Sequence, residues 1–194
     1  LGTTYGAWTV PDGLLKPDSV VYSFGLGEDI SFDLAVIERF GCKVHGFDPT
    51  PIAGAWLQSQ SLDKRFVFHP IGLGETDGMV DFFTPPEGHS FSRTSQGGTS
   101  VTRRVNRLTT IMADLGHSHI DLLKMDIEGF EYAVIEEFLS SGIRPTVINV
   151  EYHHKSYGIN SGMTKSSVGK LLASCYKPYW ISDLGREYAF ILNE

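Results

Sequence analysis

The sequence predicts a single mixed α/β domain in which helices cover a mostly parallel β-sheet. Apolar runs of strand length alternate with segments of helical periodicity along the chain, and this alternation is typical of βαβ units. The length of 194 residues, of which 41% are hydrophobic, suits one domain with one sizeable core. We therefore expect one domain over residues 1–194. The chain begins at Leu1 rather than Met, as expected of a domain excised from a longer protein.

Each element of this fold follows from a local pattern. Strands are expected at apolar runs bounded by turn residues, over residues 20–24, 43–47, 66–71, 79–83, 101–108, 121–126 and 145–152. Helices are expected where apolar residues recur every three or four positions, over residues 29–40, 51–59, 110–115, 129–139 and 163–175. A turn at Asp183-Leu184-Gly185 predicts a C-terminal antiparallel hairpin of residues 179–182 and 187–192.

The composition bears on where the protein is located and on what it can bind. No run of 18 apolar residues occurs and no basic, apolar leader opens the chain, so we expect no membrane span and a cytoplasmic location. Cys42 and Cys175 match no metal-binding spacing, and we interpret both as reduced. The sequence does not indicate an oligomeric state.

Nucleic acid is an unfavoured partner because the net charge is −7, whereas nucleic-acid binders carry a basic face. A local basic patch at Arg103, Arg104 and Arg107, with Arg93 upstream, keeps RNA as an alternative substrate. Such binding would be salt-dependent and would weaken when these arginines are changed.

The ligand is expected beyond the carboxyl ends of the parallel strands. Gly25 and Gly27 would allow the backbone to approach a ligand closely, although a plain strand-to-helix turn is the alternative. Glu28 and Asp29 occupy the turn where a dinucleotide's diphosphate would bind. Two acids repel a diphosphate and attract a cation, which favours S-adenosylmethionine over NAD, the cofactor of a rival oxidoreductase reading.

Asp48 closes the second strand about twenty residues beyond Gly27 and could accept hydrogen bonds from ribose hydroxyls. Its alternative role is a helix cap before Pro49. Gly72 and Leu73 follow the third strand and complete the expected cofactor-binding set at this edge of the sheet.

The segment LLKMDIEG carries the candidate catalytic groups. Asp126 falls at the strand end and could orient the acceptor, act as a base or hold a metal. Glu128 could take part in catalysis or only stabilise the start of a helix. His153, at the end of the next strand, could accept the proton of a substrate hydroxyl.

A divalent metal is an optional feature of this edge. Glu151 and His153 have the same parity along their strand and could converge. With Asp126 they could form an O/O/N site, although the spacing does not demand a metal.

These residues resemble the FkbM family of methyltransferases over about residues 20–154. The strongest similarity is LLKMDIEGFEYAVI, while VYSFGLGEDISFD and VHGFDPTP resemble the family's glycine turn and ribose-binding acid. In place of the family's acid two residues before the first glycine stands Ser23, and Asp29 stands in place of a later glycine. Glu28 or Asp29 could take over contacts to the methionine ammonium.

The resemblance implies a Rossmann-like class I methyltransferase fold with a mostly parallel seven-stranded sheet. It also implies transfer of a methyl group from S-adenosylmethionine, usually to an oxygen, in glycans or natural products. The long loop of residues 85–100 is the candidate acceptor lid, with Ser90, Ser92, Arg93 and His154 as candidate substrate contacts. A non-catalytic Rossmann-like binding module is the remaining alternative.

Overall fold

The computed structural model describes residues 1–84, 99–154, 156 and 158–193. Its main sheet has seven strands in the order β3-β2-β1-β7-β8-β10-β9. They are β1 (Val20–Phe24), β2 (Lys43–Phe47), β3 (Phe66–His69), β7 (Leu122–Met125), β8 (Val147–Glu151), β9 (Tyr176–Ile181) and β10 (Glu187–Leu192). The first five pair in parallel, and β10 is antiparallel to both β8 and β9. This confirms the predicted sheet and its C-terminal hairpin.

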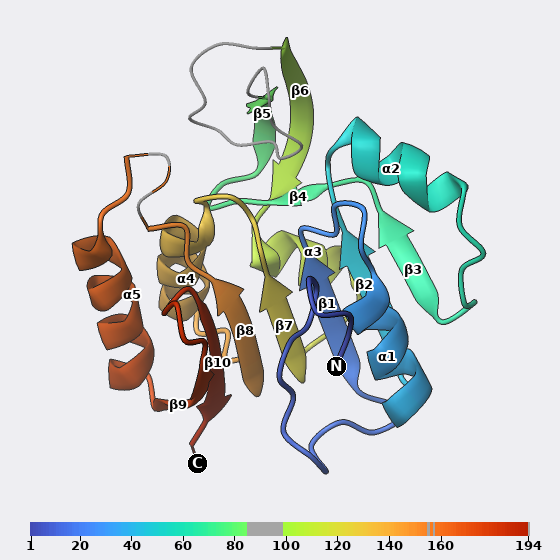
Figure 1. Cartoon of the computed structure of the whole chain (residues 1–194). Helices are drawn as coiled ribbons and strands as arrows, with labels where there is room; N and C mark the ends of the chain where they lie inside the picture. Colours follow the sequence, from blue (N-terminus) through green and yellow to red (C-terminus); the bar gives the residue numbers. More distant parts are fainter. Residues whose placement is uncertain (85–98, 155, 157, 194) are drawn as a thin grey trace.

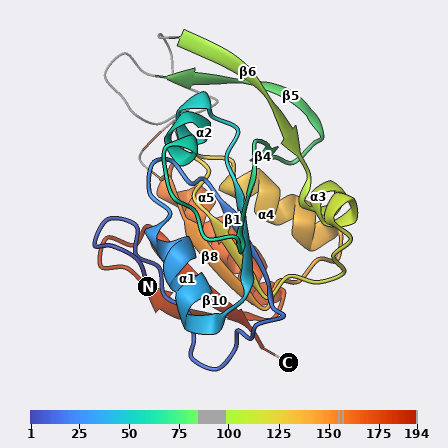
Figure 2. The same ribbon diagram turned by 90° about the vertical axis from the view of Figure 1, so that its right-hand side faces the viewer.

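A second, three-stranded sheet stands above the carboxyl ends of the parallel strands (Figures 1 and 2). It consists of β4 (Gly72–Leu73), β5 (Gly78–Thr84) and β6 (Thr99–Asn106). The predicted third strand over residues 66–71 is therefore too long, since β3 ends at His69. Pro70 follows at once, and because proline has no N–H to donate to a strand ladder, the chain leaves the main sheet there.

Helices cover both faces of the main sheet (Figure 2). They are α1 (Ser31–Phe40), α2 (Pro51–Gln58), α3 (Leu108–Leu115), α4 (Glu131–Ser140) and α5 (Ser161–Ala173). The predicted fourth helix began at Gly129, two residues too early. Glu128 and Gly129 have φ values of 55° and 100°, outside the right-handed helical region, so the helix starts only after them.

The core forms two layers, one on each face of the main sheet. Tyr22, Leu123 and Ile148 pack against α3, α4 and α5, whereas Val21, Leu122 and Val147 pack against α1, α2 and the N-terminal segment. The central strands are thus buried on both faces, as parallel sheets require. The open edge at their carboxyl ends is where functional groups can meet a ligand. Among the described residues, no helix combines the length and apolarity needed to cross a bilayer.

A histidine cluster lies on the α3-facing side of the sheet. His45 is buried, and its Nδ1 lies 3.0 Å from Nε2 of His69. The Tyr22 hydroxyl lies 2.7 Å from Nδ1 of His117. Burial, together with the neighbouring imidazoles of His69 and His117, lowers the pKa of His45 to about 4. The folded protein therefore keeps this side chain neutral where the unfolded chain would protonate it.

We expect the free energy of unfolding to fall on acidification because of His45. Its folded pKa lies below the unfolded value, so the unfolded chain gains a proton first as the pH drops below about 6.5. The loss attributable to His45 is about 2 kcal/mol between pH 7 and pH 5. Urea denaturation at both pH values should show a smaller pH dependence in His45→Gln. An equal pH dependence in the variant and the wild type would refute this assignment.

In the turn after β1, the structure requires glycine at position 25 more strictly than at position 27. At Gly25 (φ 77°) an added Cβ would overlap the carbonyl oxygen of Asp126, whereas at Gly27 (φ 55°) it would meet no atom within 4 Å. We expect Gly25→Ala to lower the free energy of unfolding by about 2–4 kcal/mol. The matched variant Gly27→Ala should cost only about 1 kcal/mol, for its left-handed backbone. Similar losses in urea denaturation would contradict the role of the Asp126 contact.

Candidate methyl-transfer site

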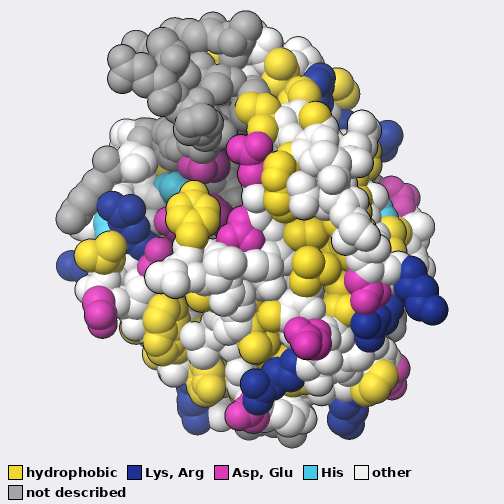
Figure 3. Space-filling view, turned by 45° about the vertical axis from the view of Figure 1, so that its right-hand side comes forward, with side chains coloured by type: hydrophobic (Ala, Val, Ile, Leu, Met, Phe, Trp, Pro, Cys, Tyr) yellow, Lys and Arg dark blue, Asp and Glu magenta, His cyan; other side chains and the backbone are white. Residues whose placement is uncertain are grey.

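A pocket of about 810 Å³ lies between the carboxyl ends of the parallel strands and the small sheet. Its lining includes every residue of the expected cofactor-binding set: Gly25, Gly27, Glu28, Asp29, Asp48, Gly72 and Leu73. The described residues of the lining include five acids, Glu28, Asp29, Asp48, Asp126 and Glu128, and no Lys, Arg or His side chain. Acidic side chains also gather on the upper half of this face, beside hydrophobic ones (Figure 3). The pocket therefore favours a ligand that carries positive charge.

Asp48 holds the glycine turn in place. Its Oδ2 accepts hydrogen bonds from the backbone N–H groups of Leu26 and Gly27, both at 3.0 Å. Its Oδ1 accepts from the backbone N–H and the hydroxyl of Thr50, at 2.8 and 2.6 Å. The carboxylate thus joins the turn after β1 to the start of α2. The predicted role of Asp48 in binding ribose stays a prediction. The structure shows a second role, which is to shape the glycine turn.

The two acids of the turn differ in their surroundings. Asp29 accepts hydrogen bonds from the backbone N–H of Ser31 (2.7 Å) and the hydroxyl of Thr3 (2.8 Å). These bonds lower its pKa even though partial burial opposes the charge. Asp29 therefore ties the first residue of α1 to the N-terminal segment, whereas Glu28 is exposed in the lining of the pocket. Of the two, Glu28 is better placed to meet a ligand ammonium.

Aromatic side chains that the sequence analysis did not single out form the apolar part of the lining. Phe24 and Phe47 stack with ring centroids 4.3 Å apart, and Phe82 of β5 stacks on Phe130 at 5.6 Å. All four line the pocket. Because Phe82 comes from the small sheet, only the three-dimensional arrangement shows that it belongs to the site. Such walls suit the flat apolar faces of a nucleobase.

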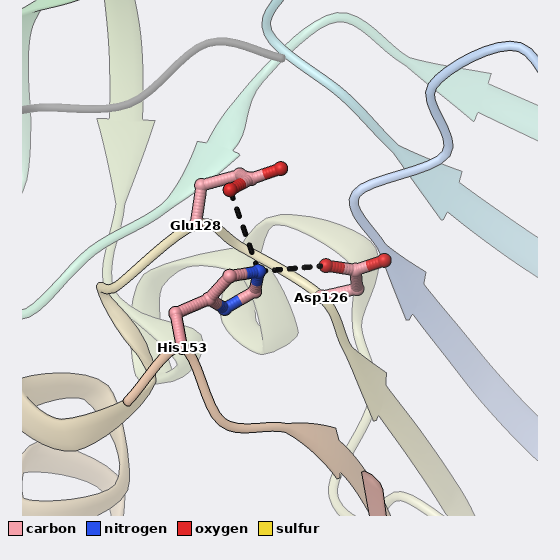
Figure 4. A group of neighbouring side chains, drawn as sticks. All are labelled: Asp126, Glu128 and His153. Atoms are coloured by element: carbon pink, nitrogen blue, oxygen red, sulfur yellow. Dashed lines mark ion pairs between the residues drawn. The ribbon is translucent and has the colours of Figure 1, made fainter. Parts of the chain in front are cut away.

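Asp126, Glu128 and His153 lie close together beyond the carboxyl ends of β7 and β8 (Figure 4). Nε2 of His153 lies 3.4 Å from Oε2 of Glu128 and 3.7 Å from Oδ1 of Asp126. The structure thus brings together all three residues predicted to be catalytic. Among the described residues they are also the group whose potential metal-ligand atoms all lie within 4.8 Å of one another. Glu151, predicted as a ligand together with Asp126 and His153, is not part of that group.

Glu131, at the first position of α4, orients His153. Its side chain is completely buried, and its Oε1 accepts a hydrogen bond from Nδ1 of His153 at 2.8 Å. The same carboxylate accepts from the backbone N–H groups of Ile127 (3.1 Å) and Gly129 (3.0 Å). The structure thus gives Glu131 a role that the sequence analysis did not assign to it. Its complete burial and its hydrogen bond to His153 indicate that it holds the imidazole ring in place.

The charges around His153 keep it protonated at neutral pH. Burial opposes the imidazolium, but the hydrogen bond to Glu131 and the charges of Glu131, Glu128 and Asp126 raise its pKa to about 9. A protonated imidazole must lose a proton before it can accept one. Asp126 is therefore the better placed of the two predicted bases. Burial and the nearby Asp126 raise the pKa of Glu151 to about 7.

Lys124 stabilises the backbone at the end of β1, beneath the pocket. Its Nζ donates hydrogen bonds to the carbonyl oxygens of Gly25 (2.6 Å) and Phe24 (3.2 Å) and lies 4.0 Å from Oδ2 of Asp126. Lys124 and Asp126 therefore lie on the same side of the sheet at the end of β7. The buried Asp33 of α1 also feels this charge. Burial raises the pKa of Asp33 to about 6, and Lys124 opposes that rise.

The predicted substrate contacts are only partly described. Ser90, Ser92 and Arg93, with most of the predicted lid, lie outside the described residues. His154 lies toward α5, where its Nδ1 is 3.4 Å from the Thr164 hydroxyl.

The structure divides the predicted basic patch. Arg103 and Arg104 are neighbours on β6 and face opposite sides, while Arg107 forms an ion pair with Asp77 at 3.3 Å.

The fold and the acid-lined pocket define a class of protein, the Rossmann-like methyltransferases. Comparison with known proteins agrees with this class. Residues 20–188 match the model of the methyltransferase FkbM domain, and the chain belongs to this family. It is 29% identical over 159 residues to the probable methyltransferase-like protein 24 of Rattus norvegicus, covering 81% of this chain and 39% of that protein. The human protein of the same name is 29% identical over 160 residues, covering 81% and 38%. The chain thus spans about two fifths of the length of these relatives.

We expect Glu131→Gln to bring the pKa of His153 down from about 9 toward its ordinary value of about 6.5. The substitution removes a charge and a charge-assisted hydrogen bond that both favour the imidazolium. NMR titration of the His153 ring in metal-free buffer measures the change. Glu136→Gln, on the exposed side of the same helix, is the matched control and should leave the titration unchanged. If both variants titrate like the wild type, Glu131 does not set the charge state of His153.

Proposed function

We propose that this protein is an S-adenosylmethionine-dependent O-methyltransferase whose acceptor is a hydroxyl group of a sugar, a glycan or another natural product. The observation that carries the proposal is the lining of the pocket. It combines a glycine turn, stacked aromatic side chains and carboxylates, and its described residues include no basic side chain. A phosphorylated dinucleotide would meet repulsion here, whereas a sulfonium with an ammonium group would be attracted.

The described residues fit this cofactor. The volume of about 810 Å³ falls in the range of small-molecule sites. Gly27 leaves open space where any side chain would project. Asp48 and the backbone of the turn would hold the ribose end, the four phenylalanines would cover the base, and Glu28 would meet the ammonium group.

The residues of the catalytic cluster would then act on the acceptor. Bound S-adenosylmethionine supplies an electrophilic methyl group for a nucleophilic oxygen. Asp126, 32% exposed and flanked by Lys124 and His153, can accept the proton that the acceptor hydroxyl loses. Glu131 keeps the His153 ring fixed, and the protonated ring can donate a hydrogen bond to an acceptor oxygen. The enzyme mainly contributes proximity and orientation.

A sugar hydroxyl suits this part of the pocket better than an apolar acceptor. Asp126, Glu128 and His153 present charged groups that pair with polyhydroxylated ligands through several hydrogen bonds. RNA is the less favoured acceptor, because the described arginines of the predicted basic patch are divided: Arg103 and Arg104 face opposite sides of β6, and Arg107 pairs with Asp77.

Titration calorimetry with S-adenosylhomocysteine tests the proposal. We expect micromolar binding by the wild type and at least about tenfold weaker binding by Asp48→Ala, since the variant loses the bonds that shape the glycine turn. Asp81→Ala, an exposed acid of β5 that pairs with Thr102, is the matched control and should bind normally.

Absence of binding in all three proteins, with circular dichroism confirming that they are folded, would refute the cofactor assignment. The non-catalytic Rossmann-like module would then be the better reading. Equal affinities for the wild type and Asp48→Ala would show that the cofactor binds elsewhere.

A further inference from the structure

We propose that Asp126, Glu128 and His153 form a binding site for a divalent cation of the Mn²⁺ type, at the end of the pocket where the acceptor enters. The site itself stands on the geometry of these side chains. Its role toward the acceptor rests on the function proposed above.

The spacing of the three ligand atoms is the first observation. Nε2 of His153 lies 3.4 Å from Oε2 of Glu128 and 3.7 Å from Oδ1 of Asp126, and all three atoms lie within 4.8 Å of one another. Ligands bound to a cation at about 2.1–2.2 Å lie roughly 3.0–3.6 Å apart. The three atoms therefore need to move by only a few tenths of an ångström to about 1 Å to share one ion.

The second observation is the support behind His153. A histidine that binds a metal through one ring nitrogen usually donates the other N–H to a carboxylate. Here Nδ1 lies 2.8 Å from Oε1 of Glu131, a side chain with no exposed surface. Glu131 is in turn held by two backbone N–H groups, which fix the orientation of its carboxylate. This arrangement leaves Nε2 directed at Asp126 and Glu128 (Figure 4), where a bound cation would take the place of the Nε2 proton.

The third observation is the backbone at Glu128, which has a φ of 55°. A residue with a Cβ rarely adopts this left-handed conformation, and it costs on the order of 1 kcal/mol or more. The conformation turns the Glu128 carboxylate back over the strand ends toward His153 (Figure 4). Strain of this kind persists where the surrounding structure enforces it, and here it completes the ligand set.

The donor set selects the class of ion. Two carboxylates and one imidazole suit divalent ions such as Mn²⁺, and no thiolate is present among the three to favour a soft metal. Three protein ligands leave coordination positions open on an octahedral ion. Asp126 and Glu128 also line the pocket, so open positions can face an acceptor.

An acceptor with two adjacent hydroxyl groups could occupy two of those positions at once. Chelation would fix one oxygen in a defined place and lower its pKa, which are the two established effects of a bound cation on a hydroxyl nucleophile. The site therefore favours vicinal diols, such as those of a sugar ring, over single hydroxyl groups.

A titration with Mn²⁺ alone tests the site. Binding is measured as the decrease in the electron paramagnetic resonance signal of free Mn²⁺. We expect the wild type to bind one Mn²⁺ and Glu128→Gln to bind at least about tenfold more weakly. Glu151→Gln is the matched control, because Glu151 is a nearby acid outside the three-residue group. Its affinity should stay within about threefold of wild type, the effect of one more distant charge. Thermal unfolding of each variant verifies that it is folded.

Two results would overturn the site: no binding by the wild type at about 1 mM free Mn²⁺, or weakening by Glu151→Gln as large as that by Glu128→Gln. S-adenosylhomocysteine binding, measured on the same samples with and without Mn²⁺, separates the two proposals. Cofactor binding without Mn²⁺ binding refutes the cation site alone. Absence of cofactor binding under both conditions refutes the proposed function, whatever the cation does.

Discussion

The contact between the ends of β1 and β7 is the constraint on which the rest of the site depends. Gly25 lies so close to the carbonyl of Asp126 that no side chain fits between them, and Lys124 binds the carbonyls of Phe24 and Gly25 from below. Asp48 fixes the following N–H groups from the other side. The glycine turn is thus held by its close contact with the Asp126 backbone, by the Lys124 ammonium group and by the Asp48 carboxylate. Its rigidity places the cofactor pocket and the Asp126 carboxylate in a fixed relation to each other.

That relation joins two half-sites built by different physical means. The half proposed for the cofactor consists of backbone and stacked rings, which recognise shape. The acceptor half consists of charged side chains whose positions depend on Glu131, a buried carboxylate at the start of α4. A buried acid is costly unless it is paired, and here a cationic imidazole and two N–H groups pair it. The same bonds that stabilise Glu131 therefore orient His153.

Much of this arrangement could be predicted from the sequence, because strand periodicity and glycine turns are local signals. The seven-stranded sheet and the meeting of Asp126 with His153 follow from the rule that parallel strands end at one edge. The ligand set of Asp126, Glu151 and His153 came from strand parity alone. Parity could not foresee that Glu128 turns back through a left-handed backbone. Nor could it place Phe82, since the small sheet forms by long-range pairing of β4, β5 and β6.

The proposed ligands give a physical reason for so much negative charge at one edge of the sheet. Asp126, Glu128 and Glu131 outnumber the cations His153 and Lys124 among them, and Asp29 and Glu28 add to the excess. In the unliganded protein this charge costs stability, since like charges repel across a partly buried site. A sulfonium and an ammonium group in one half, and a divalent cation in the other, would each remove part of that cost. Relief of this repulsion would contribute to the binding of both proposed ligands, so the acidic edge would favour the cofactor and the cation for a single electrostatic reason.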